Sequence, residues 1–307
     1  MGNRHSICYE NLRDDVEIVA VADCVEEKAK EIADKFGAKI YKTGMELMNS
    51  EELDYVDICL PTYLHTEHAV YAMEKGMNVF LEKPVCLNEE EAQLLLETQK
   101  KTGMKVQIGQ VERFCKAVIW LKETVEKGTY GKILHGSFYR LSVFPAWGWE
   151  NWFADYTKSG TAALDLHVHD TDLVRYIMGE PTDVNSVASR DKDGIIQHIF
   201  TTFKYDDAII NVEGGWDYDT KFGFSYGYRV KLENATAVFT GSELLVHTND
   251  GETIRHDTKC DEYWYELKAF IEHINADNEI KVAPLDEGIE SVRLVWKEIE
   301  SAGGAKI

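Results

Sequence analysis

The sequence predicts an α/β protein with a doubly wound parallel sheet, followed by a second α/β domain whose open-faced sheet is mixed or antiparallel. In the first third of the chain, short β-branched segments alternate with segments of helical periodicity, as in βαβ units. After about Phe114, several strand-like segments alternate apolar with polar residues, which is typical of a sheet with one buried face. We therefore expect one domain over residues 1–113 and another over residues 114–307.

The elements of the first domain follow from apolar runs and stop signals. The run VEIVAVA at Val16–Ala22 predicts a buried strand that ends at Asp23. A helix is expected over Glu26–Phe36, where apolar residues recur at helical spacing before Gly37. Asn88 and Glu91 form a capping-box pattern at the start of another helix. The remaining expected elements are strands at 39–41, 56–60, 78–81 and 105–108, and helices at 65–75 and from 88 to about 103.

The second domain is expected to combine a long sheet with helices near its start and end. Helical patterns cover 118–126, 261–275 and 286–301. The expected strands are 133–141, 184–188, 197–204, 208–216, 228–233, 237–240 and 244–247. A sheet that is open on one face is normally covered by another subunit, so we expect at least a dimer.

Composition indicates a protein that binds small molecules. The chain has 33 Lys and Arg against 54 Asp and Glu, a formal net charge of -21. Such a surface repels phosphate backbones and anionic lipid, so we expect neither nucleic acid nor membrane as a partner. No signal-peptide pattern or membrane-spanning apolar run is found, and the six cysteines form no CxxC pair. These features predict a cytoplasmic protein.

Asp23 is a candidate cofactor residue, because an acidic side chain at this strand end can accept hydrogen bonds from an adenosine ribose. It would also repel a 2′-phosphate, which favours NAD over NADP; the alternatives are a solvated aspartate or a helix cap. The usual companion, a strand followed by GxGxxG, is not found in the sequence. Gly2 can match only the third glycine. Because the strand before that motif lies in the middle of the sheet, we expect two inner strand edges without partners.

Four segments together resemble the family of glucose–fructose oxidoreductase, inositol dehydrogenase and rhizopine-catabolism proteins, abbreviated Gfo/Idh/MocA. These segments are VEIVAVAD (16–23), DICLPTYLHTEHAVYAMEKGMNVFLEKP (57–84), GQVERF (109–114) and AALDLHVHDTDLVRYIMGEP (162–181). The resemblance implies a Rossmann-type domain followed by an open-faced α/β domain. It also implies NAD(P)-linked oxidation or reduction of sugars, inositols or related compounds by a homodimer or homotetramer.

The resemblance also assigns residues. Lys83 matches the lysine that meets both cofactor and substrate hydroxyl, and Asp165 and His169 match the outer members of the motif Asp-x-Gly-x-His. The middle member is His167 in place of glycine. Arg113 is expected to be structural. The positions implied for cofactor binding are Gly2, Asn3, Asp23, Pro61, Leu64, His65, Glu82 and Lys83.

These assignments lead to a chemical hypothesis. On a helix, Asp165 and His169 share a face, so the carboxylate can orient an imidazole that takes the proton of a secondary alcohol. Lys83 would stabilise the developing alkoxide. The alternatives are a helix cap for Asp165, a core histidine for His169 and a surface lysine before a turn for Lys83.

Nearby residues suggest further roles. Trp152 and His167 are candidate substrate contacts, since aromatic faces stack on sugars. The group Asp165, His167, His169, Asp170 and Asp172 also has the residue types that bind zinc or iron. Because His167 and His169 are two apart on a helix and point to different sides, no metal is expected.

The leading hypothesis is therefore an NAD(P)-dependent dehydrogenase that acts on a sugar, inositol or sugar derivative. A second enzymatic hypothesis is action on an imine or a bilin-like molecule. From a different class comes a truncated, non-catalytic member that retains the substrate domain and oligomer interface but has lost cofactor binding. The lack of the glycine loop favours that alternative, whereas the Lys83, Asp165 and His169 set favours an enzyme.

Overall fold

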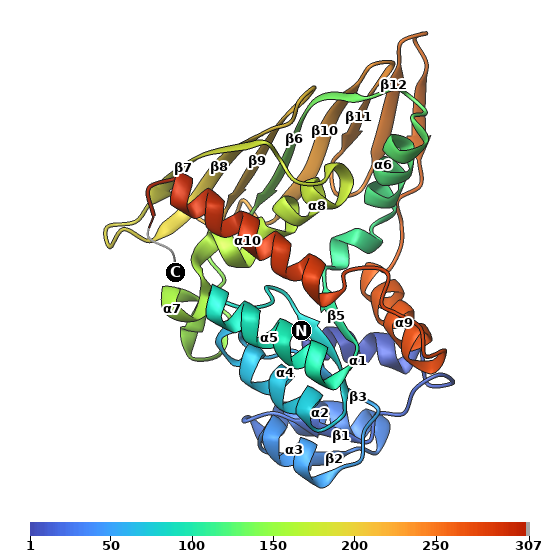
Figure 1. Cartoon of the computed structure of the whole chain (residues 1–307), viewed down its shortest axis with the longest axis vertical. Coiled ribbons are helices and arrows are strands. Elements are labelled where there is room, and N and C mark those ends of the chain that lie inside the picture. Colours follow the sequence, from blue (N-terminus) through green and yellow to red (C-terminus); the bar gives the residue numbers. More distant parts are fainter. Residues whose placement is uncertain (305–307) are drawn as a thin grey trace. The chain divides into compact units, whose positions relative to one another are not determined.

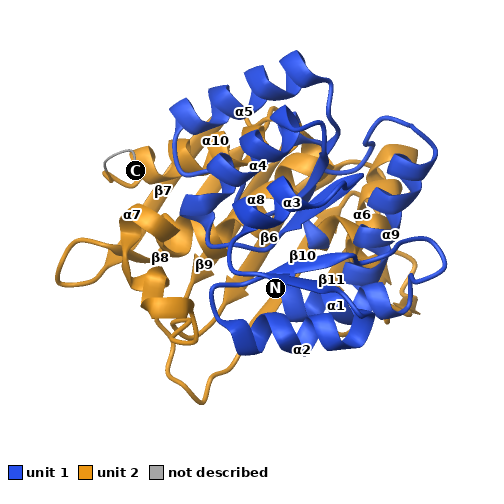
Figure 2. Cartoon of the chain, turned by 90° about the horizontal axis from the view of Figure 1, so that it is seen from below, with its two compact units in different colours: residues 1–111, 261–286 blue, residues 112–260, 287–307 orange. Residues whose placement is uncertain are grey.

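The computed structural model describes residues 1–304, which form two compact units (Figure 2). Unit 1 comprises residues 1–111 and 261–286, and unit 2 comprises residues 112–260 and, among the described residues, 287–304. The predicted boundary after residue 113 lies close to the first crossing. Residues 261–286, however, were expected in the second domain and belong to unit 1.

Unit 1 is built from parallel strands and helices in the expected alternation (Figure 1). Its strands are β1 (Ala20–Ala22), β2 (Lys39–Tyr41), β3 (Tyr55–Ile58), β4 (Asn78–Glu82) and β5 (Val106–Gly109). Its helices are α1 (Gly2–Glu10), α2 (Glu26–Phe36), α3 (Gly44–Ser50), α4 (His65–Glu74), α5 (Glu89–Thr102) and α9 (Glu262–Asn275).

Local signals set several of these helix ends. Asn88 caps α5 by accepting a hydrogen bond from the amide of Glu91 at 3.0 Å. Gly103 ends the same helix with φ 73°, a left-handed conformation that favours glycine. Helix α3, which sequence analysis missed, has a similar signal, since Thr43 accepts from the amide of Glu46 at 3.1 Å.

The parallel sheet of unit 1 is divided in two. Strand β1 pairs with β2, and β3, β4 and β5 pair in that order, all in parallel. Within residues 1–304, β1 and β3 form no ladder with each other. The predicted strand Val16–Ala22 is regular only over Ala20–Ala22, because β1 has a paired strand along only one edge.

Helix α9 joins unit 1 because its apolar face completes that unit's core. Leu267, Phe270 and Ile271 are buried against Tyr9 of α1 and Phe80 of β4. The Phe270 and Phe80 rings meet edge to face at 5.5 Å. Tertiary packing thus assigns α9 to unit 1, although the strands of that unit all lie within residues 1–111.

A buried polar network links α1 to the end of β3. The Nδ1 of His5 lies 2.8 Å from Oδ2 of Asp57, and the Tyr9 hydroxyl donates to the same oxygen at 3.0 Å. Cys59 donates to the other oxygen at 3.4 Å. Burial raises the pKa of Asp57, but His5 and these hydrogen bonds lower it further, so its net direction is down. Burial lowers the pKa of His5, yet Asp57 raises it well above 6.5.

Unit 2 is organised by an eight-stranded sheet in the order β13-β12-β11-β10-β6-β9-β8-β7. Neighbouring strands are antiparallel except β6 and β9, which are parallel, so the sheet is mixed as predicted. Its strands are β6 (Ile133–Leu141), β7 (Asp183–Arg190), β8 (Ile196–Lys204), β9 (Ile209–Gly215), β10 (Ser225–Leu232), β11 (Ala235–Phe239), β12 (Leu244–Thr248) and β13 (Thr253–His256). Sequence analysis missed β13.

The main helices of unit 2 lie along one side of this sheet (Figure 1). They are α6 (Lys116–Lys127), α8 (Val168–Met178) and α10 (Leu285–Ser301), whose residues from 287 belong to this unit. Val118, Leu121, Val174 and Leu294 bring these helices into the same core as the inward side chains of the strands. On the other face, Val187, Phe200 and Ile209 are about half exposed. The sheet is therefore open on one face.

No helix among the described residues combines the length and apolar character needed to cross a membrane.

The His5–Asp57 pair predicts a pH dependence for unit 1. A pKa raised in the folded state contributes stability that is complete below about pH 6.5 and is lost as pH rises through the raised value. We expect hydrogen exchange of the β3 and β4 amides to become faster as the pH rises above about 6.5, beyond the intrinsic change. In Asp57→Asn the excess change should vanish, because burial then dominates the pKa of His5. An equal excess in both proteins would contradict this account.

Candidate functional site

The carboxyl end of β1 places Asp23 where the sequence predicted a cofactor residue. Its Oδ1 accepts a hydrogen bond at 2.8 Å from the amide of Val25, the residue that precedes α2. The carboxylate therefore has the local role of capping the turn before α2. Because that bond engages one oxygen, the half-buried carboxylate can still offer Oδ2 to a ribose.

The segment after β4 presents Lys83 alone. From Val79 to Leu87 every residue is buried except Lys83, which is half-buried. Its amide donates to Oε2 of Glu82 at 3.2 Å, and Oε1 of Glu82 lies 3.1 Å from Nε2 of His5. Glu82 is thus occupied within unit 1, and it fixes the backbone from which Lys83 projects.

His65 braces the ends of two neighbouring strands. Its Nε2 lies 2.8 Å from the carbonyl oxygen of Leu60, and its Nδ1 lies 2.8 Å from that of Pro84. The ring is buried, and burial lowers its pKa despite the two carbonyls. A neutral ring carries one N–H, so it donates to one of these two carbonyls at a time, and it lies between the Pro61 turn and the segment around Lys83. The structure gives His65 this bracing position rather than an exposed wall of a cofactor site.

The remaining cofactor candidates lie at helix starts. Pro61 precedes the short helix η1 (Thr62–Leu64), which contains Leu64. Gly2 and Asn3 open α1, whose first turn carries no acidic side chain. The first amide that donates within the helix is that of Arg4, so the start of α1 has the polarity that favours an anion. A Cβ on Gly2 would make only an ordinary contact with Ile32 at 3.8 Å.

In unit 2, Asp165 and His169 lie on the accessible side of one continuous helical segment. Asp165 is in the π-helical turn η4 (Ala163–His167), and His169 is in the first turn of α8. Both side chains are half-buried, whereas His167, Val168 and Asp170 between and beside them are buried. Single π-turns are frequent at functional sites. Unit 2 thus carries two of the three predicted catalytic residues on one helical segment, and Lys83 belongs to unit 1.

His167 points the other way, into the core of unit 2. Its Nε2 lies 2.6 Å from Oε2 of Glu298 on α10, and both side chains are fully buried. The hydroxyls of Thr171 and Thr201 donate to the same carboxylate at 2.7 and 2.5 Å. A Cβ on Gly214 would lie 2.6 Å from Nδ1 of His167, so only glycine leaves room for the ring. This placement supports the fold, and it replaces the expected substrate contact for His167.

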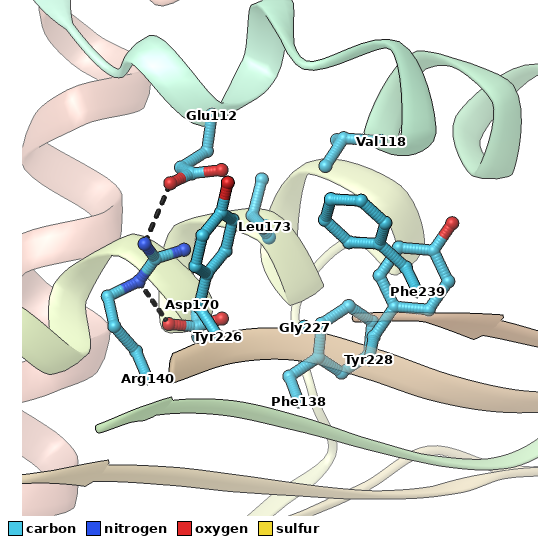
Figure 3. Close-up of a pocket in the computed structure, with 10 residues that line it drawn as sticks. All are labelled: Glu112, Val118, Phe138, Arg140, Asp170, Leu173, Tyr226, Gly227, Tyr228 and Phe239. Atoms are coloured by element: carbon cyan, nitrogen blue, oxygen red, sulfur yellow. Dashed lines mark hydrogen bonds and ion pairs between the residues drawn. The ribbon is translucent and has the colours of Figure 1, made fainter. Parts of the chain in front are cut away.

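A second buried anchor holds Asp170. Arg140 on β6 donates to Asp170 at 2.7 Å and pairs with Glu112 at 2.7 Å (Figure 3). Burial raises the pKa of Asp170, and Arg140 offsets part of that shift. Figure 3 shows the guanidinium between the two carboxylates, beside Tyr226. The cavity next to this network is about 10 Å³, room for about one water, so it is no substrate pocket.

A third anchor holds Asp172. Arg113 donates to both of its oxygens, at 2.9 and 2.7 Å, and Ser291 of α10 donates at 2.6 Å. Arg113 also lies over the Tyr176 ring at 4.6 Å. Arg113 therefore has the structural role that was expected of it. His167, Asp170 and Asp172 each bind a different partner, so these three candidate metal ligands do not converge on one site.

Aromatic side chains lie next to this segment. Trp152 is half-buried and stacks on Phe153 at 4.0 Å, and Phe153 meets Trp216 at 6.2 Å. Leu166, the neighbour of Asp165, packs against the same cluster. Trp147 is 78% exposed. Trp152, the predicted aromatic contact, therefore lies close in unit 2 to the turn that carries Asp165.

Sequence reasoning missed Glu298 and Gly214. Glu298 lies between buried Trp296 and Ile299, at a position of α10 that faces the core. A carboxylate at the apolar phase of an amphipathic helix is a signal that could have identified it. Gly214 offers no comparable signal, because its importance depends on the His167 ring. That ring is distant in the sequence, and only the fold brings it near Gly214.

The contact between His167 and Gly214 can be tested by a double-mutant cycle. Gly214→Ala should lower the free energy of unfolding by about 1–3 kcal/mol, because the new Cβ would overlap the imidazole. In a His167→Gly background, the same substitution should cost less than about 1 kcal/mol, since the clashing ring is absent. Urea denaturation of the four proteins measures both values. Equal costs in the two backgrounds would show that the ring does not require Gly214.

Comparison with known proteins places the chain among two-domain oxidoreductases. Residues 1–110 match the family model described as "Oxidoreductase family, NAD-binding Rossmann fold", and residues 118–238 match the "GFO/IDH/MocA C-terminal domain". Myo-inositol 2-dehydrogenase of Thermotoga maritima is 33% identical over 60% of this chain and 54% of its own length. D-glucoside 3-dehydrogenase of Escherichia coli is 25% identical over 96% of this chain and 90% of its own. The alignment with the Thermotoga protein thus spans only about half of that relative.

Solved structures agree on the fold. Levoglucosan dehydrogenase in complex with NADH and levoglucosan superposes with a TM-score of 0.87 and 21% identity, over 99% of this chain and 94% of that one. Myo-inositol 2-dehydrogenase from Lactobacillus plantarum gives 0.84 and 22%, over 98% and 94%. The predicted family resemblance and fold class are confirmed: the chain belongs to the Gfo/Idh/MocA family of oxidoreductases.

Proposed function

We propose that this protein is an NAD-linked dehydrogenase that transfers a hydride between the cofactor and a secondary alcohol of a sugar, inositol or sugar derivative. The observation that carries the proposal is the pair Asp165 and His169. These two side chains stay accessible on a helical segment whose neighbouring polar residues are all tied into the core. A rigid, accessible carboxylate–imidazole pair suits general acid–base chemistry.

The relatives support the substrate class. Their names describe dehydrogenases of inositol and of a glucoside, and the family model describes an NAD-binding fold. Trp152 stays half-buried next to Leu166, whereas Phe153 and Trp216 are buried, so the Trp152 ring is the one suited to stacking on the C–H face of a sugar. These similarities favour the dehydrogenase over both the non-catalytic alternative and the imine or bilin alternative.

The residues of unit 1 fit both ends of NAD. Asp23 can accept hydrogen bonds from the adenosine ribose through Oδ2, and its charge disfavours NADP. The start of α1, with Gly2 and Asn3, has the polarity for a pyrophosphate. Lys83 is the accessible cation at the carboxyl end of β4, where such sheets bind ligands.

The proposed mechanism gives each residue one task. NAD, when bound, supplies the hydride acceptor for the carbinol carbon. His169 takes the hydroxyl proton as the C–H bond breaks and the carbonyl forms, so the products are a ketone, NADH and one proton on the imidazole. Asp165 stabilises the charged imidazole, and Lys83 stabilises the negative charge that develops on the oxygen.

We also propose a homodimer or homotetramer assembled through the open face of the eight-stranded sheet. Val187 and Phe200 form an exposed apolar pair across β7 and β8, and Ile209 is exposed on the same face of β9, opposite Lys204. Exposed apolar groups on a sheet face often mark an interface. Light scattering of Phe200→Glu against the unaltered protein tests the assignment, because a charge at the apolar pair should shift the mass toward the monomer.

The function itself is tested by following NADH absorbance. Purified protein is incubated with NAD and a panel of inositols, glucosides and anhydrosugars, and in parallel with NADP. NADH formation with at least one polyol, and weaker reaction with NADP, is the expected result. Failure of NADH to bind at millimolar concentration, measured by its fluorescence, would overturn the proposal.

Lys83→Ala should lower turnover by about a hundredfold or more, because a preorganised charge at the developing alkoxide is lost. NADH affinity should change much less. Lys101→Ala is the matched control, since Lys101 is an exposed lysine of the same unit that pairs with Glu74 on the surface. Turnover of Lys83→Ala equal to that of the control would remove Lys83 from the chemistry.

A further inference from the structure

Glu298 holds a position that the proposed chemistry does not explain. Its carboxylate is fully buried on α10, where burial of a charge is unfavourable unless it is bonded. It accepts three hydrogen bonds, from His167, Thr171 and Thr201. Two of these donors lie on the helical segment that carries His169, and the third lies on β8 of the sheet.

The two helical donors bracket His169. His167 precedes it by two residues and Thr171 follows it by two, so a single carboxylate spans one helical turn around it. Residues four apart lie on one face of the helix, and His169 lies away from that face. Holding positions 167 and 171 therefore fixes the rotation of the turn about its own axis.

The bonds from Glu298 to His167 and Thr171 are called the clamp below, and the third bond, from Thr201, connects this clamp to the sheet. Thr201 donates to the same oxygen that meets His167, and Gly214 on the adjacent strand β9 lets the His167 ring approach the backbone. Within the described residues, Nδ1 of His167 has no hydrogen-bond partner. The ring therefore bonds through Nε2, and it cannot change partners without leaving Glu298 short of a donor.

Purely apolar packing would not give the same control. Apolar side chains fill a space but tolerate small rotations of the helix. Three short hydrogen bonds to one buried carboxylate, in contrast, define the rotation of the helical turn about its axis. The relative direction of the Asp165 and His169 side chains also depends on the π-turn, which contains Asp165 and ends at His167. The bonds to Glu298 therefore begin at the residue where the π-turn ends.

We propose that Glu298 is a positioning residue, which acts through His167 and Thr171 to set the orientation of the His169 imidazole relative to Asp165. This inference rests on the proposed function for the roles of Asp165 and His169. Glu298 acts through its bonds to His167 and Thr171 and contributes no proton to the reaction.

The first test compares Glu298→Leu with Glu298→Gln. Leucine fills the volume but accepts no hydrogen bond, so kcat should fall about ten- to a hundredfold while KM and NADH affinity stay within about twofold. Glutamine keeps the clamp, because its oxygen can accept from His167 and Thr201 while its amide donates to the Thr171 hydroxyl. Rescue of kcat by glutamine is expected. Equal kcat in the leucine variant and the unaltered protein would overturn the proposal.

A gentler pair of variants serves if the leucine variant does not fold. Thr171→Val and Ser291→Ala each remove one buried hydroxyl bond between α8 and α10. Only the first breaks the clamp, since Asp172 keeps both bonds from Arg113 in the second. Thr171→Val should lower kcat and Ser291→Ala should not, at matched thermal stability. Parallel losses in both would mean that these bonds only stabilise the fold.

An NMR titration separates this inference from the proposed function. The imidazole resonance of His169, assigned by its loss in His169→Gln, reports the surroundings of the ring without any substrate. Its midpoint should shift in Glu298→Leu and Thr171→Val and remain unchanged in Glu298→Gln and Ser291→Ala. If the unaltered chain oxidises no polyol, the proposed function fails while this comparison still decides the positioning. An identical midpoint in all four variants would overturn the clamp.

Discussion

The structure of unit 2 depends on charges buried beneath one helical segment. Asp170, Asp172 and Glu298 are almost fully buried, and each is bonded to donors from a different element. Removing one partner of a buried ion pair typically costs about 3–5 kcal/mol, because the remaining charge is left uncompensated. A rotation of the segment would disturb all three sets of bonds at once. The segment is therefore held in one orientation, and this also fixes the backbone positions of Asp165 and His169.

In unit 1, side-chain hydrogen bonds connect elements that the divided sheet leaves unpaired. Its parallel sheet is divided between β1 and β3, so no continuous ladder of backbone hydrogen bonds connects its two parts. Side chains make the connection to α1 instead: His5 bonds to Asp57 at the end of β3 and lies beside Glu82 at the end of β4. Glu82 and His65 in turn hold the backbone on either side of Lys83. The accessible lysine is thus presented by a polar framework that starts at the first helix.

The predictability of these features follows the distance over which their causes act. Helix α2 and the cap at Asn88 were predictable because their signals lie within a few residues. The family segments identified Lys83, Asp165 and His169, and the structure leaves all three accessible. The assignment of α9 to unit 1 was not predictable, because it depends on Phe270 meeting Phe80. Likewise, His167 looked like a substrate contact, and only the fold reveals the carboxylate and glycine that hold it in the core.

The replacement of a motif glycine by His167 is best understood as one part of a set of three residues. A histidine at this position needs space, which Gly214 supplies by lacking a side chain, and it needs an acceptor, which Glu298 supplies from α10. Glu298 without the histidine would be a buried charge short of a donor, and any larger residue at position 214 would collide with the ring. None of the three residues is favourable alone. The same interactions that make the histidine tolerable in the core also fix the helix on which the proposed base is carried, so packing and catalytic geometry in this unit are set by one cluster.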